Sequence, residues 1–318
     1  MRTIKRLCSL IIGFIFFVAG ILKLMDPVGV NLIVSEYLKF LHLGFLNSGA
    51  YLIASILSLL ETITGIALMV GVWRRITAII SGIMLLFFTL LTIILVIVNP
   101  NMDCGCFGEA IHLTHAQSLI KNIFLCILWT IAFVPLQDVQ NTLVEYVVFF
   151  MTSILCVFYL IYSLNSIPLV DFTPYSSGTQ LAQVDENYSK DAPHLSFSNK
   201  VGEYVDSLIS SGKVLISSVY EPEKLNSKQW ARIAQNLKTA DSQGYCALLL
   251  IASTPNNAKI ETSDLILQDN VYFADRRTLM TLNRSNGGYT EILDGCIINK
   301  WPTNHTISQT EMATSARL

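Results

Sequence analysis

Two cysteines separated by a single glycine, Cys104 and Cys106, are the residues of this sequence whose types and spacing best suit chemistry. They lie in the segment Asp103–Gly108, beside polar residues and glycines, so packing in an apolar core does not account for them. Glycine has no side chain and permits a tight backbone bend, which allows the two sulfurs to approach each other. Such a pair can cycle between a dithiol and a disulfide, or offer two thiolates to a metal ion.

The first hypothesis is thiol–disulfide exchange. A helix that begins after the loop would favour a thiolate, because helix dipoles stabilise anions at the N-terminus. A disulfide across one glycine would be strained and therefore oxidising. Electrons would then pass from an extracytoplasmic thiol to Cys104 and Cys106, and from there to a quinone held between membrane helices.

Two other hypotheses stay open. The segment after the cysteines contains His112 and His115, and the four residues form the pattern C-x-C-x5-H-x2-H, a ligand set that suits zinc. Alternatively, Cys104 and Cys106 form a fixed disulfide that only pins the loop, while a soluble domain binds a partner protein. Loss of activity on chelation would favour the metal, and full function with both cysteines replaced by serine would favour the structural role.

The composition indicates a membrane protein. The chain of 318 residues is 52% hydrophobic and only 14% charged, whereas soluble domains carry about 25% charged residues. A net charge of −2 gives no sign of a nucleic-acid partner. Seven cysteines in a chain of this length are not a disulfide scaffold. Four of them lie in apolar runs and are predicted to be inert core thiols, namely Cys8, Cys126, Cys156 and Cys246.

Five apolar segments reach the length of about 20 residues that a helix needs to cross a bilayer. They are Leu7–Met25, Ala50–Val72, Ile76–Val98, Ala116–Val134 and Leu143–Leu164. The fourth segment contains Lys121 near its start, where a lysine side chain can extend to the membrane interface.

The basic residues predict how these segments are oriented, because cytoplasmic loops are enriched in lysine and arginine. Arg2, Lys5 and Arg6 precede the first segment, and Arg74 and Arg75 follow the second. We therefore expect a protein of the bacterial cytoplasmic (inner) membrane with its N-terminus in the cytoplasm. The cysteine loop and everything after the fifth segment would then be extracytoplasmic, where disulfides are permitted.

Two charged residues within the apolar segments are further candidates. Glu61 lies near the middle of the second segment, where a carboxyl group is costly unless it is paired, protonated or facing a cavity. Lys23, near the outer end of the first segment, is a candidate partner. A structural pair, a proton relay and cofactor binding all remain open for these two residues. Between the segments, apolar residues at helical spacing within Pro27–Gly49 predict an amphipathic interfacial helix near the cysteine loop.

The last part of the chain alternates in type like a soluble α/β domain. Pro, Ser, Asp and Asn residues without periodicity predict a linker, and a helical pattern follows at Val201–Ile209. Asn226 is the predicted N-cap of an amphipathic helix that ends before Gly244, and Asp294-Gly295 predicts a hairpin turn. The predicted strands are Lys213–Val219, Tyr245–Ala252, Asn270–Ala274, Tyr289–Leu293 and Cys296–Lys300, with a short helix at Arg277–Arg284.

The membrane part resembles the DoxX/MauE group of small bacterial four-helix membrane proteins. The resemblance covers about residues 1–140 and rests on Gly20–Pro27, on Glu61 with the glycines that follow it, and above all on Asn99–Gly108. It implies maturation of a disulfide-rich periplasmic dehydrogenase subunit in methylamine utilisation, or thiosulfate or quinone redox chemistry. The group is also similar to the four-helix bundle of vitamin K epoxide reductase, in which cysteines pass electrons to a quinone. That bundle has the pattern C-x-x-C where this sequence has C-x-C.

The order βαβα followed by a hairpin is similar to a thioredoxin-like domain, a mixed sheet with helices on both faces. A thioredoxin carries C-x-x-C after its first core strand, and Tyr220–Glu223 occupies that place here without a cysteine. We therefore predict a membrane all-α four-helix bundle with a fifth transmembrane helix and a C-terminal α/β thioredoxin-like domain. The predicted parts are the bundle at 1–140, the fifth helix at 141–165, a linker at 166–195 and the extracytoplasmic domain at 196–318.

Overall fold

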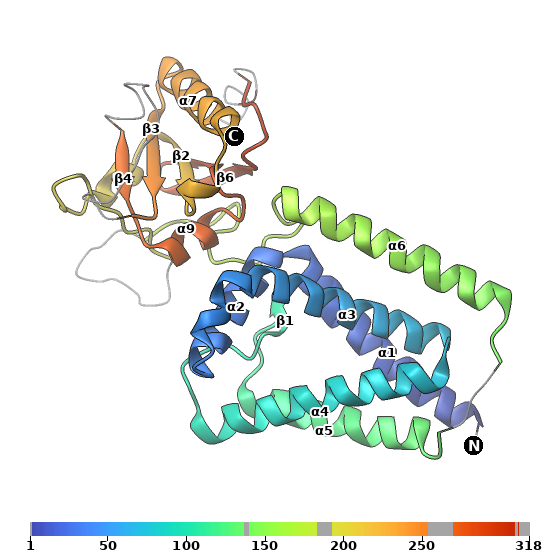
Figure 1. Cartoon of the computed structure of the whole chain (residues 1–318). Coiled ribbons are helices and arrows are strands. Elements are labelled where there is room, and N and C mark those ends of the chain that lie inside the picture. Colours follow the sequence, from blue (N-terminus) through green and yellow to red (C-terminus); the bar gives the residue numbers. More distant parts are fainter. Residues whose placement is uncertain (1, 137–139, 183–192, 254–269, 309–310, 312–318) are drawn as a thin grey trace. The chain divides into compact units, whose positions relative to one another are not determined.

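The computed structural model describes residues 2–136, 140–182, 193–253, 270–308 and 311. The chain divides into two compact units, Met1–Leu164 and Asn165–Leu318 (Figure 1). The first is helical and the second is built on a mixed β-sheet. Each unit is described by itself.

Five helices of the first unit are long and apolar enough to cross a membrane, which confirms the five predicted segments. Their bounds differ from the predicted ones by at most a few residues at either end. The helices are α1 (Arg2–Met25), α3 (Ala50–Val70), α4 (Arg74–Val98), α5 (His115–Phe133) and α6 (Leu143–Asn165).

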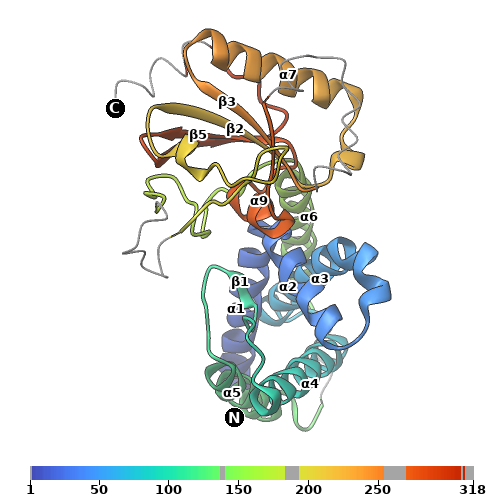
Figure 2. The same cartoon turned by 90° about the vertical axis from the view of Figure 1, so that its left-hand side faces the viewer.

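Helices α1 and α3 approach each other closely, because glycines remove the side chains between them. A Cβ atom on Gly65 would lie 2.5 Å from the backbone nitrogen of Phe17, and one on Gly13 would lie 2.8 Å from the Gly65 carbonyl oxygen. Such close approach of backbones is a common way for membrane helices to associate. Helices α4 and α5 lie side by side in both views (Figures 1 and 2), and α5 packs against α1 while α4 contacts α3.

One end of the bundle is filled by apolar side chains and closed by basic ones. Ile12, Phe16, Leu68 and other buried apolar residues form its core. The guanidinium of Arg6 donates hydrogen bonds to the Leu68, Met69 and Val70 carbonyl oxygens at the C-terminus of α3. Arg74 donates likewise to Ala132 and Lys5 to Val134 at the C-terminus of α5. These cations satisfy carbonyl groups that have no partner within the helix.

Helix α6 packs on α1 and α3 through Phe149, Cys156 and Leu160. Near its N-terminus, the Trp73 ring meets the rings of Phe149 and Phe150 with centroid distances of 5.4 and 5.9 Å. Near its C-terminus, Ser163 donates a hydrogen bond to the Met25 carbonyl at the end of α1. Helix α6 therefore begins at the basic end of the bundle and ends at the opposite one.

The helix predicted within Pro27–Gly49 is present as α2 (Pro27–Phe40), followed by a 3-10 turn at Gly44–Gly49. The carboxylate of Asp26 caps α2 by accepting a hydrogen bond from the Gly29 backbone, and Pro27 takes the first helical position. Aspartate as N-cap and proline after it are a favourable start for a helix.

The second unit contains a five-stranded sheet in the order β4-β3-β2-β5-β6. Strands β2, β3 and β4 are parallel, whereas β5 and β6 form an antiparallel hairpin beside β2. The turn of this hairpin is Asp294-Gly295, with φ angles of 47° and 77°, as predicted. The strands are β2 (Lys213–Val219), β3 (Cys246–Ile251), β4 (Val271–Phe273), β5 (Gly288–Leu293) and β6 (Cys296–Trp301).

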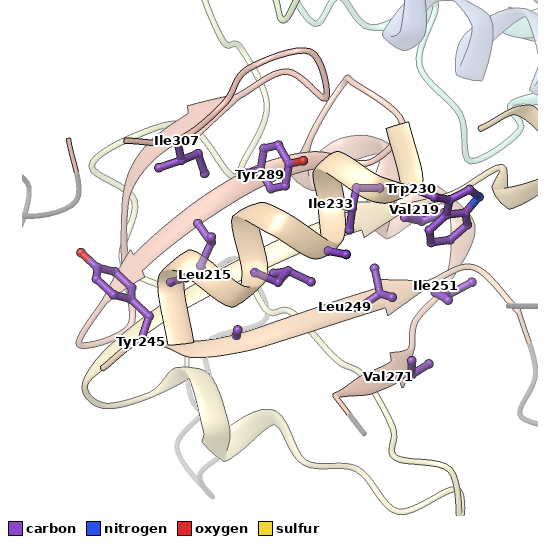
Figure 3. Close-up of a cluster of buried hydrophobic side chains, with 14 of the residues drawn as sticks. Leu215, Val219, Trp230, Ile233, Tyr245, Leu249, Ile251, Val271, Tyr289 and Ile307 are labelled. Atoms are coloured by element: carbon purple, nitrogen blue, oxygen red, sulfur yellow. The ribbon is translucent and has the colours of Figure 1, made fainter. Parts of the chain in front are cut away.

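Helix α7 (Ser227–Ser242) covers one face of this sheet. Asn226 caps it as predicted, and Trp230 and Ile233 reach from it into the apolar core with Leu215 and Leu249 (Figure 3). The short helix α9 (Arg276–Leu282) lies on the opposite face (Figure 2). Two further 3-10 turns occupy Asp206–Ile209 and Pro222–Lys224.

Three details differ from the sequence-based expectations. Of the predicted helix Val201–Ile209, only the 3-10 turn Asp206–Ile209 is present. Cys246 is exposed at the start of β3, so it is not a core thiol. Part of the predicted linker packs on the sheet domain, because Gln180 bridges to Cys296 and Asp171 forms an ion pair with Lys300 at 2.6 Å. Residues 183–192 of that linker lie outside the described residues.

Candidate functional site

The cysteine loop connects α4 to α5 at the end of the bundle opposite the basic residues. Asn99 ends α4 in the left-handed conformation with a φ of 48°. The short strand β1 (Cys106–Glu109) follows, between Gly105 and the residues that lead to α5. Gly105 and Gly108 have φ angles of 64° and 63°, which side chains rarely allow, so both glycines are needed for this bend.

The bend brings the two cysteine sulfurs together. The Cys104 and Cys106 sulfurs lie 3.0 Å apart, and both residues are free thiols. Cys104 is buried with 7% of its surface exposed, whereas Cys106 is partly exposed. Cys106 is therefore the more accessible of the two sulfurs.

Helix α2 covers the loop. The Tyr37 hydroxyl donates a hydrogen bond of 2.7 Å to the Cys104 carbonyl oxygen. A Cβ atom on Gly105 would lie 2.5 Å from Cγ2 of Ile33, so this glycine also gives α2 the space to approach. The predicted position of this helix near the cysteines is thus correct, and it holds the loop in place.

A buried ion pair lies on the bundle side of the loop. Lys23 on α1 and Glu61 on α3 meet at 2.5 Å, with only 7% and 5% of their side chains exposed. The Lys23 side chain also passes next to Gly108, and its ammonium lies 5.6 Å from the centre of the Phe88 ring. The structural pair considered from the sequence is therefore present, and it lies against the cysteine loop.

Helix α5 adds two groups that the sequence did not single out for the site. The Lys121 ammonium lies over the Phe107 ring, 5.0 Å from its centre. Ser118 is fully buried in the first turns of α5, and its hydroxyl makes no hydrogen bond of normal geometry with any residue that the structure describes. The hydroxyl nevertheless lies close enough to both cysteine sulfurs to favour their thiolate forms.

The two thiols differ in acidity because one donates a hydrogen bond to the other. Accepting that bond from Cys104 lowers the pKa of Cys106 to about 5, against the effect of burial and with the help of the positive charges of Lys121 and Lys23. Donating the bond raises the pKa of Cys104, and burial raises it further. Burial raises the pKa of Tyr37, and the nearby cysteines raise it further, so the Tyr37 hydroxyl stays neutral.

The candidate metal ligands are not brought together. His112 faces Asp103 at 3.4 Å, and His115 contacts the Met102 carbonyl oxygen at 2.9 Å. Within the described parts of the chain, no group of three or more His, Cys, Asp and Glu side chains is placed to hold a metal ion.

The residues proposed for a cofactor, Lys23 and Glu61, use each other as partners. The missed groups Tyr37 and Ser118 carried little sequence signal, whereas Lys121 stood out as a charge in an apolar segment.

Comparison with known proteins gives one family. Residues 1–136 match the family model described as Methylamine utilisation protein MauE. No curated protein and no solved structure matches the chain at a significant level. The match includes α1 to α5, and so contains the cysteine loop and the Lys23–Glu61 pair. Over these residues the chain is therefore a MauE-like membrane protein, and the name of the matched family links that family to methylamine utilisation.

Proposed function

We propose that the chain is a membrane thiol–disulfide exchange protein that acts through Cys104 and Cys106 in the maturation of an extracytoplasmic partner protein. The observation that carries this proposal is the pair itself, two thiols with sulfurs 3.0 Å apart in a loop formed by two glycines of positive φ. The accessible, more acidic Cys106 would form the mixed disulfide with the partner and Cys104 would be the buried second cysteine of the pair, because a reactive cysteine needs thiolate character and access.

The placement of charges supports an extracytoplasmic site. Arg6, Arg74 and Lys5 gather at one end of the bundle, and the cysteine loop occupies the other. Because basic residues mark the cytoplasmic side of the membrane, the loop would face the outside of the inner membrane. Helix α6 ends at the loop end, so the sheet unit would lie in the same compartment as the cysteines.

We further propose that the sheet unit is a thioredoxin-like module that binds the partner rather than reacting with it. Support comes from its strand order, with a parallel βαβ unit beside an antiparallel hairpin and a helix on each face. At the place of the thioredoxin cysteines, the Asn286 side chain accepts hydrogen bonds from the Tyr220 and Glu221 backbone and donates one to the Glu221 carbonyl oxygen. The segment is thus held rigidly and has no thiol.

The test is the redox state of Cys104 and Cys106 in intact cells. Thiols are trapped with acid and labelled with a maleimide that adds mass, in the wild type and in a Cys104→Ser variant. A mixture of dithiol and disulfide, and a trapped mixed disulfide with a partner in the variant, would support exchange. A pair that stays fully oxidised and ignores mild reductant would contradict it and leave the fixed disulfide.

A second arm of this experiment identifies the electron acceptor. A membrane quinone would accept two electrons from the dithiol and regenerate the disulfide. If quinone is the acceptor, brief depletion of quinone should shift Cys104 and Cys106 toward the dithiol. An unchanged ratio in depleted cells would contradict quinone coupling and leave the exchange function intact.

A further inference from the structure

The Cys106 sulfur lies among charges supplied by three helices. The Lys23 side chain from α1 passes next to Gly108 and the Lys121 ammonium from α5 lies over the Phe107 ring, so both lysines flank the short strand that contains Cys106 and favour its thiolate. Glu61 from α3 pairs with Lys23 at 2.5 Å and also interacts electrostatically with Cys106. Lys23 is therefore shared between two anions, the Glu61 carboxylate and the Cys106 thiolate. The ion pair is almost completely excluded from water.

The charges of this cluster balance in only one redox state. With Cys106 as thiolate and Cys104 as thiol, the ammonium groups of Lys23 and Lys121 face two negative charges, on Glu61 and Cys106. When the two sulfurs form a disulfide, the thiolate charge disappears and one positive charge is left in excess. A poorly solvated charge without a counter-charge is costly, so the cluster favours the dithiol over the disulfide.

Other titratable groups near Cys106 do not change this balance. Tyr37 stays neutral, and the carboxylate of Asp103 is more than half exposed beside His112, where water screens it. Asp26, which accepts a hydrogen bond from the Gly29 backbone, and Glu109 lie against that glycine. Their charges are the same before and after disulfide formation, so they do not distinguish the two states.

We propose that the cysteine pair works as an oxidant of client dithiols, and that Lys23 is the positioning residue that sets this direction because Glu61 and Cys106 share it. The inference rests on the proposed exchange function and specifies its substrate class. The substrate is an extracytoplasmic protein with two accessible thiols, in which this protein forms a disulfide.

The exchange step transfers two electrons from the client to the pair. One client thiol loses its proton to water and attacks the Cys106 sulfur, and Cys104 leaves and takes up a proton. The second client thiol then loses its proton to water, and its sulfur attacks the client sulfur of the mixed disulfide. Cys106 leaves as a thiolate. The client has lost two electrons and two protons. Cys104 has gained one of these protons, and the other has passed to water.

The test measures the reduction equilibrium of the full-length protein in detergent or nanodiscs. The wild type is equilibrated with mixtures of reduced and oxidised glutathione, trapped with acid and labelled with a mass-adding maleimide. In a Lys23→Met variant we expect the dithiol-to-disulfide ratio to fall about tenfold, equivalent to about 30 mV. In a Glu61→Gln variant we expect the ratio to rise, because Lys23 then serves the Cys106 thiolate alone.

The opposite signs separate an electrostatic role from a purely structural one, which would move both variants in the same direction. Lys39→Met, at an exposed lysine of α2, is the matched control and should leave the ratio unchanged. If Lys23→Met does not fold because Glu61 is left buried and unpaired, Lys121→Met takes its place and should lower the ratio as well. Lys121 is only partly buried, and its ammonium lies over the Phe107 ring, whereas the Glu61 carboxylate keeps its ion pair with Lys23 in this variant.

The outcomes also separate this inference from the proposed function. A wild-type pair that never equilibrates with glutathione would overturn both. A pair that equilibrates but gives the same ratio in the lysine variants, or shifts in the same direction in Lys23→Met and Glu61→Gln, would overturn the inference alone. The exchange function would then stand with its direction set by other groups.

Discussion

At the scale of single residues, one hydrogen bond makes two chemically identical side chains unequal. Cys104 donates to Cys106 and is buried, so it keeps its proton, while Cys106 is partly exposed and surrounded by positive charge. This division suits the proposed exchange, because the accessible Cys106 forms the mixed disulfide with the client and, with its low pKa, leaves readily as a thiolate in the second step.

The unequal acidity leads to a pH-dependent labelling pattern. Because Cys106 has a pKa of about 5, iodoacetamide should alkylate it rapidly at pH 6 to 7, while Cys104 should react slowly up to pH 8. The thiolate of Cys106 stabilises the folded, reduced protein above the ordinary pKa of a thiol, and this stabilisation is lost as pH falls through about 5. Peptide mass spectrometry of the alkylated protein gives both rates, and equal rates for the two cysteines at pH 6 would contradict the assignment.

Tyr37 should protect Cys104. Replacing Tyr37 with phenylalanine removes the hydrogen bond to the Cys104 carbonyl, a loss of about 1 kcal/mol in holding the loop. We expect iodoacetamide to alkylate Cys104 faster in the Tyr37→Phe variant than in the wild type, with little change in the rate at Cys106. The control is Tyr162→Phe on the lipid-exposed side of α6, which should behave like the wild type. Slow alkylation of Cys104 in Tyr37→Phe would mean that the hydrogen bond does not limit access.

The site residues that could be predicted from the sequence are those whose type is unusual for the segment in which they lie. Site residues of a type that is ordinary for their segment were missed. Cys104 and Cys106 stood out in a polar loop, and Lys23 and Glu61 stood out in apolar segments. Tyr37 is an ordinary member of an amphipathic helix, and it becomes part of the site through a contact with a residue 67 positions away. Hydropathy and spacing carry no information about such a contact.

At the scale of elements, apolar length predicted the membrane helices well, because a bilayer imposes one simple requirement on every span. The contact between α1 and α3 was not predicted. It depends on Gly13 and Gly65 facing each other, which requires knowledge of which helices are neighbours.

The α1–α3 contact can be tested with a substitution at Gly65. The Cβ of valine at this position would lie only 2.5 Å from the Phe17 backbone nitrogen, so the helices must separate. We expect a loss of about 1–3 kcal/mol of stability, as for other overpacked sites, and weaker pairing of Lys23 with Glu61. Thermal unfolding in detergent measures the loss. Gly49→Ala is the control, because no atom lies within 4 Å of a Cβ there.

The prediction of a helix at Val201–Ile209 was wrong because local side-chain hydrogen bonds override the apolar pattern there. The Asn199 side chain accepts hydrogen bonds from the Val201 and Glu203 backbone, and Gly202 has a φ of 91°. Asparagine offers the backbone an alternative to helical hydrogen bonds. Val201 and Tyr204, which the pattern would bury, are exposed.

At the scale of the whole molecule, the chain combines a helical membrane unit with a sheet unit after α6. The mixed sheet of the second unit was predicted, because alternating strand and helix patterns followed by a hairpin allow few topologies. The pairing of Gln180 with Cys296 was not, because its segment has the composition of a linker and no periodicity.

The predicted orientation can be measured with reporters. Alkaline phosphatase fused at the C-terminus should be active, because that enzyme needs an oxidising compartment, and a fluorescent protein fused at the N-terminus should fluoresce in the cytoplasm. A membrane-impermeant maleimide should reach Cys246, which is exposed on the sheet unit, in intact spheroplasts. An inactive phosphatase fusion together with a protected Cys246 would place the sheet unit in the cytoplasm and contradict the proposed compartment.

The basic residues at the closed end of the bundle cap helices and also carry the charge that predicts the orientation of the protein in the membrane. Arg6 bonds three carbonyl oxygens of α3, and Arg74 bonds one of α5. Each hydrogen bond to a charged group is worth about 1.5–3 kcal/mol. The charges that would direct insertion are thus the same charges that complete the folded bundle. Insertion and folding are therefore not independent properties here, and a mutation that weakens the orientation signal at Arg6 also removes the cap of a helix.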